Sequence, residues 1–406
     1  MIVHPPEIVR DGADVCLSAR IETEARPQAV WPERLWFRVP ADREPLLSAR
    51  ADAFAAALFI LAMRRRETLE LHGPTSPRLL YGLEAYQRIL AVYFPTTLTP
   101  VSIHARTIAP APTPAPGAGR VMSAFSGGLD SFYTLWAHRP ERVVVPDAAV
   151  TTALFVHGLD IPLADTRTYE TCRESYAPLL AGLGVDLVPL RTNVRAFLDE
   201  VYWHRMFGAV LIASALAAGN GTRRFYVPSG IPYTDQREPD GADPRLDPWL
   251  STEALEAMHH GASLTKVDKA LALADWPATY HALRVCWEHP NGLRNCGACM
   301  KCVRTMMALE LAGSLPRYTT FDLPLTRAAV RGCRYPYPPD RGFARQLVTR
   351  ARQAGRRALV ADLRFSLLRS LSLPRPPDPR AVYRWTRAVL ARGEGLLARA
   401  RRAARR

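Results

Sequence analysis

Residues 120–131, with the sequence RVMSAFSGGLDS, decide the fold of this chain of 406 residues. The first six of them form a short, mostly apolar run typical of a buried strand, and a helical pattern extends from about Asp130 to Ala137. The glycines between these segments permit a tight turn, because glycine adopts positive φ at little cost. A strand, a glycine turn and a helix in direct succession predict the first unit of a parallel α/β sheet.

The same alternation of strands and helices continues along the chain. We expect strands at residues 153–156, 185–189 and 224–227, with helices at residues 169–183 and 207–218 between them. This order predicts an α/β fold with a doubly wound, Rossmann-like parallel sheet. In such sheets ligands bind at the carboxyl ends of the strands, so the loops that follow the strands are the first place to look for a site.

A proline-rich stretch separates this region from a smaller N-terminal unit. Residues 109–117 read APAPTPAPG, which forms neither a helix nor an interior strand because proline lacks a backbone donor. We predict an N-terminal α+β domain at 1–105, a Pro/Ala-rich linker at 106–119, the parallel domain at 120–332 and an Arg-rich helical tail at 333–406. In the first domain, strands are expected at 15–21, 35–39, 68–72 and 101–104, and helices at 51–63 and 77–94, the second with Ser76 as its N-cap.

The turn after the first strand has the features of a phosphate-binding loop. Its glycines let the backbone approach a ligand, and the helix that follows offers unpaired amides and the positive end of its dipole. Asp130 would repel a bare phosphate, so we expect it to bind a Mg²⁺ ion that bridges phosphates, or to cap the helix. The alternative is an ordinary glycine turn capped by serine. The expected binding residues are Ser126, Gly127, Gly128, Leu129, Asp130 and Ser131.

Four of the seven cysteines lie within seventeen residues, at Cys286, Cys296, Cys299 and Cys302. Their spacing, C-x9-C-x2-C-x2-C, is typical of a closed site in which four thiolates bind a structural Zn²⁺. An iron–sulfur cluster uses the same ligands and remains an alternative. The other three cysteines have no partner by spacing and are expected to be buried thiols. A clustered set of cysteines and the lack of a signal-peptide pattern predict a cytoplasmic protein.

These motifs resemble those of a known enzyme superfamily. The loop at residues 126–131 is similar to that of the PP-loop (N-type) ATP pyrophosphatases, and the cysteine site after it resembles that of 7-cyano-7-deazaguanine synthases. The resemblance covers about residues 120–311, and the first cysteine gap is one residue longer than in that family. It implies a PP-loop, HUP-like fold in which the loop binds pyrophosphate and ATP activates a carboxylate as an adenylate.

Residues outside the two motifs are further candidates. Lysine is scarce in this chain, and all three lysines fall between residues 266 and 301. The Thr-Lys pair that ends at Lys266 resembles a pair in the synthase family, and we expect Lys266 to contact phosphate, with a solvated helix face as the alternative. His157, after the second strand, is expected to contact ATP or substrate, although a turn explains it equally well. Ser229 and Gly230, after the fourth strand, are expected to receive the adenine or the substrate.

The net charge of +15 is concentrated at one end of the chain. Residues 331–406 contain 20 arginines and 4 acidic residues, whereas the first 330 residues hold 33 basic and 34 acidic residues. A basic amphipathic tail predicts binding to a polyanion such as RNA or an anionic membrane. Arginine usage driven by a GC-rich genome, on ordinary surface helices, is the alternative. The apolar run at residues 54–63 is too short to span a membrane, so we expect no transmembrane segment.

Together these observations predict an ATP-dependent, C–N ligase-like enzyme. We expect it to adenylate a carboxylate and to form an amide or nitrile with ammonia or an amine, using ATP, Mg²⁺ and Zn²⁺, with Asp130, Ser131 and Lys266 as catalytic residues. Two alternatives remain open. One is a tRNA-thiolation-like PP-loop enzyme with an iron–sulfur cluster, and the other is a non-catalytic nucleotide-binding module that recruits a partner.

Overall fold

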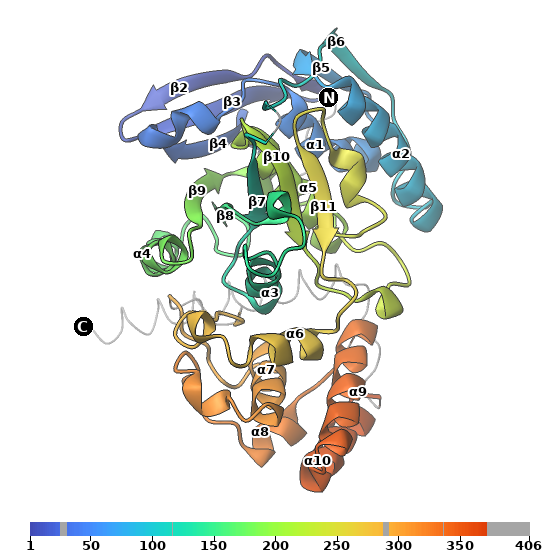
Figure 1. Cartoon of the computed structure of the whole chain (residues 1–406). Helices are drawn as coiled ribbons and strands as arrows, with labels where there is room; N and C mark the ends of the chain where they lie inside the picture. Colours follow the sequence, from blue (N-terminus) through green and yellow to red (C-terminus); the bar gives the residue numbers. More distant parts are fainter. Residues whose placement is uncertain (25–30, 116, 287–291, 336, 372–406) are drawn as a thin grey trace, which may run out of the picture.

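The computed structural model describes residues 1–24, 31–115, 117–286, 292–335 and 337–371. In these residues eleven strands form one sheet with the spatial order β11-β10-β7-β8-β9-β4-β3-β1-β5-β6, and β2 pairs with β3 (Figure 1). The strands are β1 (Ile2–Val3), β2 (Glu7–Asp11), β3 (Asp14–Glu22), β4 (Arg34–Pro40), β5 (Leu69–Thr75), β6 (Ile103–Ile108), β7 (Arg120–Ala124), β8 (Thr152–His157), β9 (Asp186–Thr192), β10 (Thr222–Pro228) and β11 (Glu256–His260).

The five strands that follow the proline-rich stretch are all parallel, which confirms the α/β fold with a parallel sheet. Their order is β11-β10-β7-β8-β9, so the chain moves outward from β7 to β9 and then crosses to β10 on the other side. The strand order therefore reverses between β7 and β10. In open parallel sheets a ligand crevice lies at such a reversal, outside the carboxyl ends of the two strands.

Helices cover both faces of this sheet, and each face has its own apolar core. In β7, Met122 packs toward the face of α1 (Asp52–Arg65) and α5 (Phe207–Ala217), because side chains alternate along a strand. Its neighbour Val121 packs toward the opposite face. That face is covered by α3 (Leu129–Ala137), α4 (Thr166–Ala181), α6 (Lys266–Leu273) and α7 (Met300–Leu311).

The strands on the two sides of the proline-rich stretch belong to the same sheet. β4 pairs antiparallel with β9, with Phe37 opposite Thr192, and α1 packs on α5 across a shared core. The expected N-terminal elements are confirmed, including α2 (Pro77–Tyr93), whose N-cap Ser76 accepts a hydrogen bond from the Leu79 N–H. The division into separate domains stays a prediction, but the N-terminal strands extend the parallel sheet directly.

The C-terminal region contains three helices, two of which pack on α7. They are α8 (Arg327–Gly332), α9 (Pro338–Gln353) and α10 (Arg357–Leu371) (Figure 1). Phe343 and Leu347 of α9 are buried in the same core as α7, so this part of the expected tail belongs to the folded body. Residues 372–406 lie outside the described residues. None of the described helices is long and apolar enough to cross a membrane.

Candidate functional site

The expected phosphate loop forms the tight turn between β7 and α3. Gly127 has a φ of +72°, and Gly128 is the N-cap residue of α3 without any side-chain capping bond. The hydroxyl of Ser131 donates to the carbonyl of Gly128 at 3.0 Å and accepts from the N–H of Ser126 at 3.4 Å, while the Ser126 hydroxyl accepts from the Gly128 N–H at 3.3 Å. Both serines therefore hold the loop in shape, and Leu129 anchors it by burial.

The loop is also fixed from outside by two segments of the chain. A Cβ placed on Gly127 would lie 1.7 Å from the phenolic oxygen of Tyr176 in α4. On the other side, the backbone N–H of Arg284 donates to the carbonyl of Gly127 at 2.8 Å. The close approach of Tyr176 explains why glycine is required here, beyond the positive φ.

We predict that Gly127→Ala destabilises the protein far more than a matched glycine substitution elsewhere. Gly184 has the same φ of +72° but open space around it, so Gly184→Ala measures the backbone cost alone, which is about 1–2 kcal/mol. The alanine at position 127 adds a clash with Tyr176 that only a shift of α4 or of the loop can relieve. Urea denaturation of both variants checks this. Equal losses in the free energy of unfolding would show that Tyr176 moves freely and does not constrain the loop.

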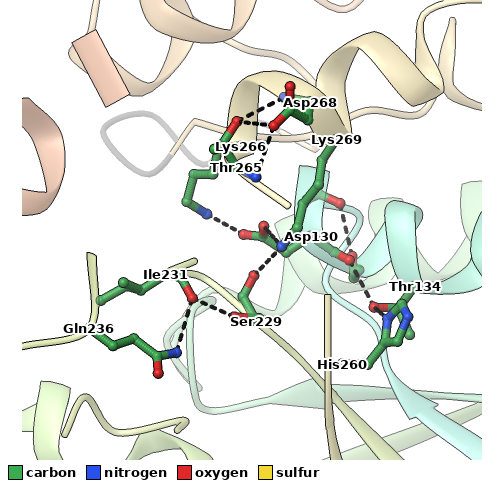
Figure 2. Close-up of polar contacts among 12 residues, drawn as sticks. Asp130, Thr134, Ser229, Ile231, Gln236, His260, Thr265, Lys266, Asp268 and Lys269 are labelled. Atoms are coloured by element: carbon green, nitrogen blue, oxygen red, sulfur yellow. Dashed lines mark hydrogen bonds and ion pairs between the residues drawn. The ribbon is translucent and has the colours of Figure 1, made fainter. Parts of the chain in front are cut away.

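Two lysines of α6 meet the carboxylate of Asp130 at the start of α3. Helix α6 begins at Thr265, which forms a capping box with Asp268, and residues three apart on the helix point to the same side. Lys266 donates to one oxygen of Asp130, and Lys269 donates to the other at 3.0 Å (Figure 2). Lys269 also donates to the carbonyl of Ser229 at 2.6 Å, which joins the end of β10 to this contact.

This cluster lies at the carboxyl ends of β7 and β10, where the strand order reverses. Ser229 directly follows β10, and its own hydroxyl donates to the carbonyl of Ile231 (Figure 2). A Cβ on Gly230 would lie 3.9 Å from the ammonium of Lys266, so Gly230 borders the cluster without touching it closely. The structure thus brings together the loop, Lys266, Ser229 and Gly230, as the sequence predicted for a common site.

Burial and the neighbouring charges change the pKa values of Lys266 and Asp130. Burial lowers the pKa of Lys266 to about 8, against the opposing effect of Asp130. Burial alone would raise the pKa of Asp130, but the charges of Lys266 and Lys269 and their hydrogen bonds hold it well below its usual range. The arrangement therefore keeps Asp130 ionised and makes Lys266 easier to deprotonate than an ordinary lysine.

Positive charge exceeds negative charge around Asp130. Lys301 and Arg304 of α7 are close enough to act electrostatically on this group, and Arg304 is paired with Asp340 of α9 at 3.0 Å. The three lysines of the chain and Arg304 thus face three carboxylates, those of Asp130, Asp340 and Asp160, the last of which acts on Lys301. An excess of one positive charge in a half-buried cluster favours the binding of an anion.

His157 occupies a different position from the one expected. It ends β8, is 1% exposed, and its Nε2 contacts the carbonyl of Pro162 at 2.8 Å while its ring stacks on Tyr169. Burial lowers the pKa of His157, which favours a neutral ring. Among the described contacts none joins His157 to Asp130 or to the lysines, and its placement is that of a packed residue at the end of a strand.

The four clustered cysteines could hold a metal ion. Their sulfur atoms all lie within 4.8 Å of one another, and three of the separations are 3.9, 3.8 and 3.4 Å. Thiolates at 2.3 Å from a tetrahedral Zn²⁺ are about 3.8 Å apart, so the group fits a single ion. In an iron–sulfur cluster the cysteines bind different irons and must lie farther apart. The observed spacing is that of a mononuclear site.

The cysteine knuckle, residues 296–302, is linked to the phosphate loop through the buried Asn295 that precedes it. Its side-chain oxygen accepts from the N–H groups of Val285 and Cys286 at 2.7 and 2.9 Å, and its amide donates to the carbonyl of Leu283. The next residue in this segment is Arg284, which binds Gly127. A metal that holds the cysteines together therefore also holds the segment against which the loop is fixed.

A cleft of about 560 Å³ opens between α4 and residues 292–294. It is lined by the first turn of α4, including Thr168 and Arg167, and by Arg294 on the other wall. No residue of the loop at 126–131 lines it, so the cleft is separate from the lysine cluster.

None of the three comparisons, with protein-family models, curated proteins and solved structures, gives a match to this chain.

Four residues of the cluster, Lys269, Lys301, Arg304 and Asp340, were not among the predicted site residues. Lys269 is 2% exposed and bridges Asp130 to Ser229, and its signal was the scarcity of lysine together with its spacing of three residues from Lys266. Arg304 and Asp340 form the other pair. Asp340 carried no local signal, because it lies in the segment expected to be a separate tail and reaches the cluster only through the packing of α9 on α7.

Proposed function

We propose that this chain is an ATP-dependent synthase or ligase of the PP-loop type, which adenylates a carboxylate and passes the acyl group to a nitrogen nucleophile. One observation carries the proposal: the three lysines of an arginine-rich chain converge on a glycine loop at the reversal point of a parallel sheet. A compact ammonium suits a phosphate oxygen, and the loop offers backbone amides at the N-terminus of α3.

In this proposal the β- and γ-phosphates lie on the loop and face Lys266 and Lys269. Asp130 orients both ammonium groups, since each of its oxygens accepts a hydrogen bond from one of them. Each oxygen of the carboxylate already accepts a hydrogen bond from a lysine, so a Mg²⁺ ion at Asp130 would compete with the two ammonium groups. The binding of Mg²⁺ together with ATP stays a prediction.

The chemistry follows from the position of the phosphates. An oxygen of the substrate carboxylate attacks the α-phosphorus, the bond to the bridging oxygen of the β-phosphate breaks, and pyrophosphate leaves. Ammonia or an amine then attacks the acyl carbon, and AMP leaves with the amide as the second product. The cationic cluster stabilises the charge that develops on pyrophosphate as it separates, which is the type of electrostatic stabilisation that preorganised donors provide.

The cysteine site has a structural role in this proposal, with Zn²⁺ bound by Cys286, Cys296, Cys299 and Cys302. Four thiolates leave no open position on a tetrahedral ion, so the site supplies folding energy and fixes the segment next to the loop. The distances between the sulfurs favour one ion over an iron–sulfur cluster. For this reason we favour the synthase over a thiolation enzyme that depends on such a cluster.

A second part of the proposal concerns the basic C-terminal region in the cytoplasm, which we assign to a polyanionic partner such as RNA or an anionic membrane. Arg345 and Arg352 are exposed on α9 seven residues apart, and Arg357 and Arg364 repeat this spacing on α10. Residues seven apart lie on one side of a helix. The two pairs thus place positive charge along exposed helix faces.

The function is tested by measuring AMP and pyrophosphate after incubation with ATP, Mg²⁺, ammonia and pooled small carboxylic acids. We expect AMP and pyrophosphate in equal amounts with the wild type, and a loss of about a thousandfold with Lys266→Met because a charge-stabilising donor is removed. Arg317→Met, which changes an exposed arginine paired with Asp275, should keep full activity. Release of ADP and phosphate in place of AMP would overturn the proposal, as would equal activity of Lys266→Met.

A further inference from the structure

One buried arginine in this protein lacks a counter-charge. Eight Asp, Glu, Lys and Arg side chains are buried among the described residues, and seven of them are paired with a side chain of opposite charge or a histidine. Arg284 is 8% exposed, and no acidic side chain in the described residues forms an ion pair with it. The seven paired residues are Asp52, Glu67, Asp243, Asp247, Lys269, Arg304 and Asp362.

Arg284 lies beside the phosphate loop. Its backbone N–H donates to the carbonyl of Gly127, and its carbonyl oxygen is 3.7 Å from the position of a Cβ on Gly128. Its charge also reaches α4: burial raises the pKa of the Cys172 thiol to about 11, and Arg284 opposes this shift, as it does for Tyr176. The guanidinium is therefore close to α4, while the backbone of the same residue contacts the loop.

Burial of a cation without a partner is costly, because the cation loses its hydration and gains no opposite charge in return. An external anion that pairs with the guanidinium would offset this cost. The location next to a phosphate loop indicates what kind of anion that is.

We propose that Arg284 binds an oxyanion of the ligand, as a second anion-binding group on the α4 side of the phosphate loop. The lysine cluster lies on the β10 side, so a ligand held by both would carry anionic groups across the loop. The planar guanidinium fits a phosphate or a carboxylate with two parallel hydrogen bonds. The α-phosphate of ATP and the carboxylate of the acid substrate share this chemistry, and their assignment as ligands rests on the proposed function.

The test compares the wild type with Arg284→Met by calorimetry, with pyrophosphate, AMP, ATP and millimolar acetate as probes. We expect the variant to bind at least one probe about ten- to a hundredfold more weakly, because a charge-assisted hydrogen bond is lost. Without ligand its melting temperature should not fall, since an unpaired buried charge is removed. Arg317→Met, which changes an exposed arginine paired with Asp275, is the control and should bind every probe as the wild type does.

The pattern of losses identifies the anion. Weaker binding of AMP and ATP with unchanged binding of pyrophosphate assigns Arg284 to the α-phosphate, and weaker binding of acetate alone assigns it to the carboxylate. If Arg284→Met does not fold, Arg284→Lys keeps the charge but loses the planar fork, and should show a smaller loss. The inference is overturned if the variants bind all four probes like the wild type, or if the wild type binds none.

Failure of this inference can be distinguished from failure of the proposed function. Lys266→Met should weaken the binding of pyrophosphate whatever Arg284 does. If that loss occurs while Arg284→Met behaves as the wild type, the loop binds phosphate and Arg284 has only a structural role. If Lys266→Met binds pyrophosphate normally but Arg284→Met does not bind AMP, the anion site stands and the role of the lysine cluster is wrong.

Discussion

Removal of the metal from the four-cysteine cluster is expected to unfold the knuckle and to detach the support of the phosphate loop. A structural Zn²⁺ site supplies about 10–16 kcal/mol at neutral pH, more than the packing of a short segment provides. The segment from Leu283 to Cys286 contains no helix or strand, and the hydrogen bonds of Asn295, next to the cysteines, hold it in place. If this segment detached, the N–H of Arg284 would no longer bind the carbonyl of Gly127.

Elemental analysis of the purified protein should therefore give one zinc per chain, and Cys299→Ser should give none. Circular dichroism of this variant should show a lower melting temperature, and its affinity for pyrophosphate should fall because the loop is no longer fixed. Cys16→Ser, which changes a buried cysteine of β3 outside the cluster, should keep both the metal and the affinity. Iron with a visible absorption band, or a Cys299→Ser protein that retains zinc, contradicts this assignment.

Asp130→Asn is expected to lower the free energy of unfolding by about 3–5 kcal/mol, as well as to stop AMP formation. The side chain of Lys269 is 2% exposed, and Asp130 is its only ionic partner in the described residues. Removal of one partner of a buried pair leaves the other charge uncompensated, and this is more costly than losing both. The same substitution would free the ammonium of Lys266.

The double variant Asp130→Asn/Lys269→Met removes both charges and should recover most of the lost stability while remaining inactive. Urea denaturation of the two single variants and the double variant gives the coupling energy between the two sites. Asp275→Asn is the matched control, because it breaks an exposed pair with Arg317 and should change stability by less than about 1 kcal/mol. Additive losses in the cycle would show that Asp130 and Lys269 do not form the pair seen here.

The sequence was most informative where local patterns determine structure. Four of the five parallel strands were predicted, because β7, β8, β9 and β10 are buried on both faces and show as apolar runs. The fifth, β11, has the sequence EAMHH and was missed. Its glutamate and two histidines interrupt the apolar pattern by which a buried strand is predicted, yet the segment pairs along its whole length with β10. At the edge of a sheet, pairing of this kind overrides composition.

The candidate site was predictable in its parts but not in its arrangement. The cysteine spacing predicted a cluster that the structure assembles, and the glycine turn predicted the loop. A helix at Lys266 was considered only as the alternative to a phosphate contact, although Thr265 and Asp268 have the spacing of a capping box. The contribution of Asp340 could not be inferred, because it depends on how α9 packs rather than on any nearby residue. Long-range packing of this type leaves no periodic signal in the sequence.

Because all three lysines lie at one site, reagents that react with primary amines can modify this protein selectively at that site. Reagents that acylate primary amines have few targets here. Lys269 and the α-amino group of Met1 are buried, whereas the side chain of Lys266 is 21% exposed and has a pKa of about 8. Lys301 of the same cluster is half-buried, and burial lowers its pKa as well. A neutral amine is the nucleophile, so Lys266 reacts at a pH where most lysines are still protonated. A fluorophore or affinity tag can thus be placed at the proposed ATP site of the natural sequence, without an engineered cysteine.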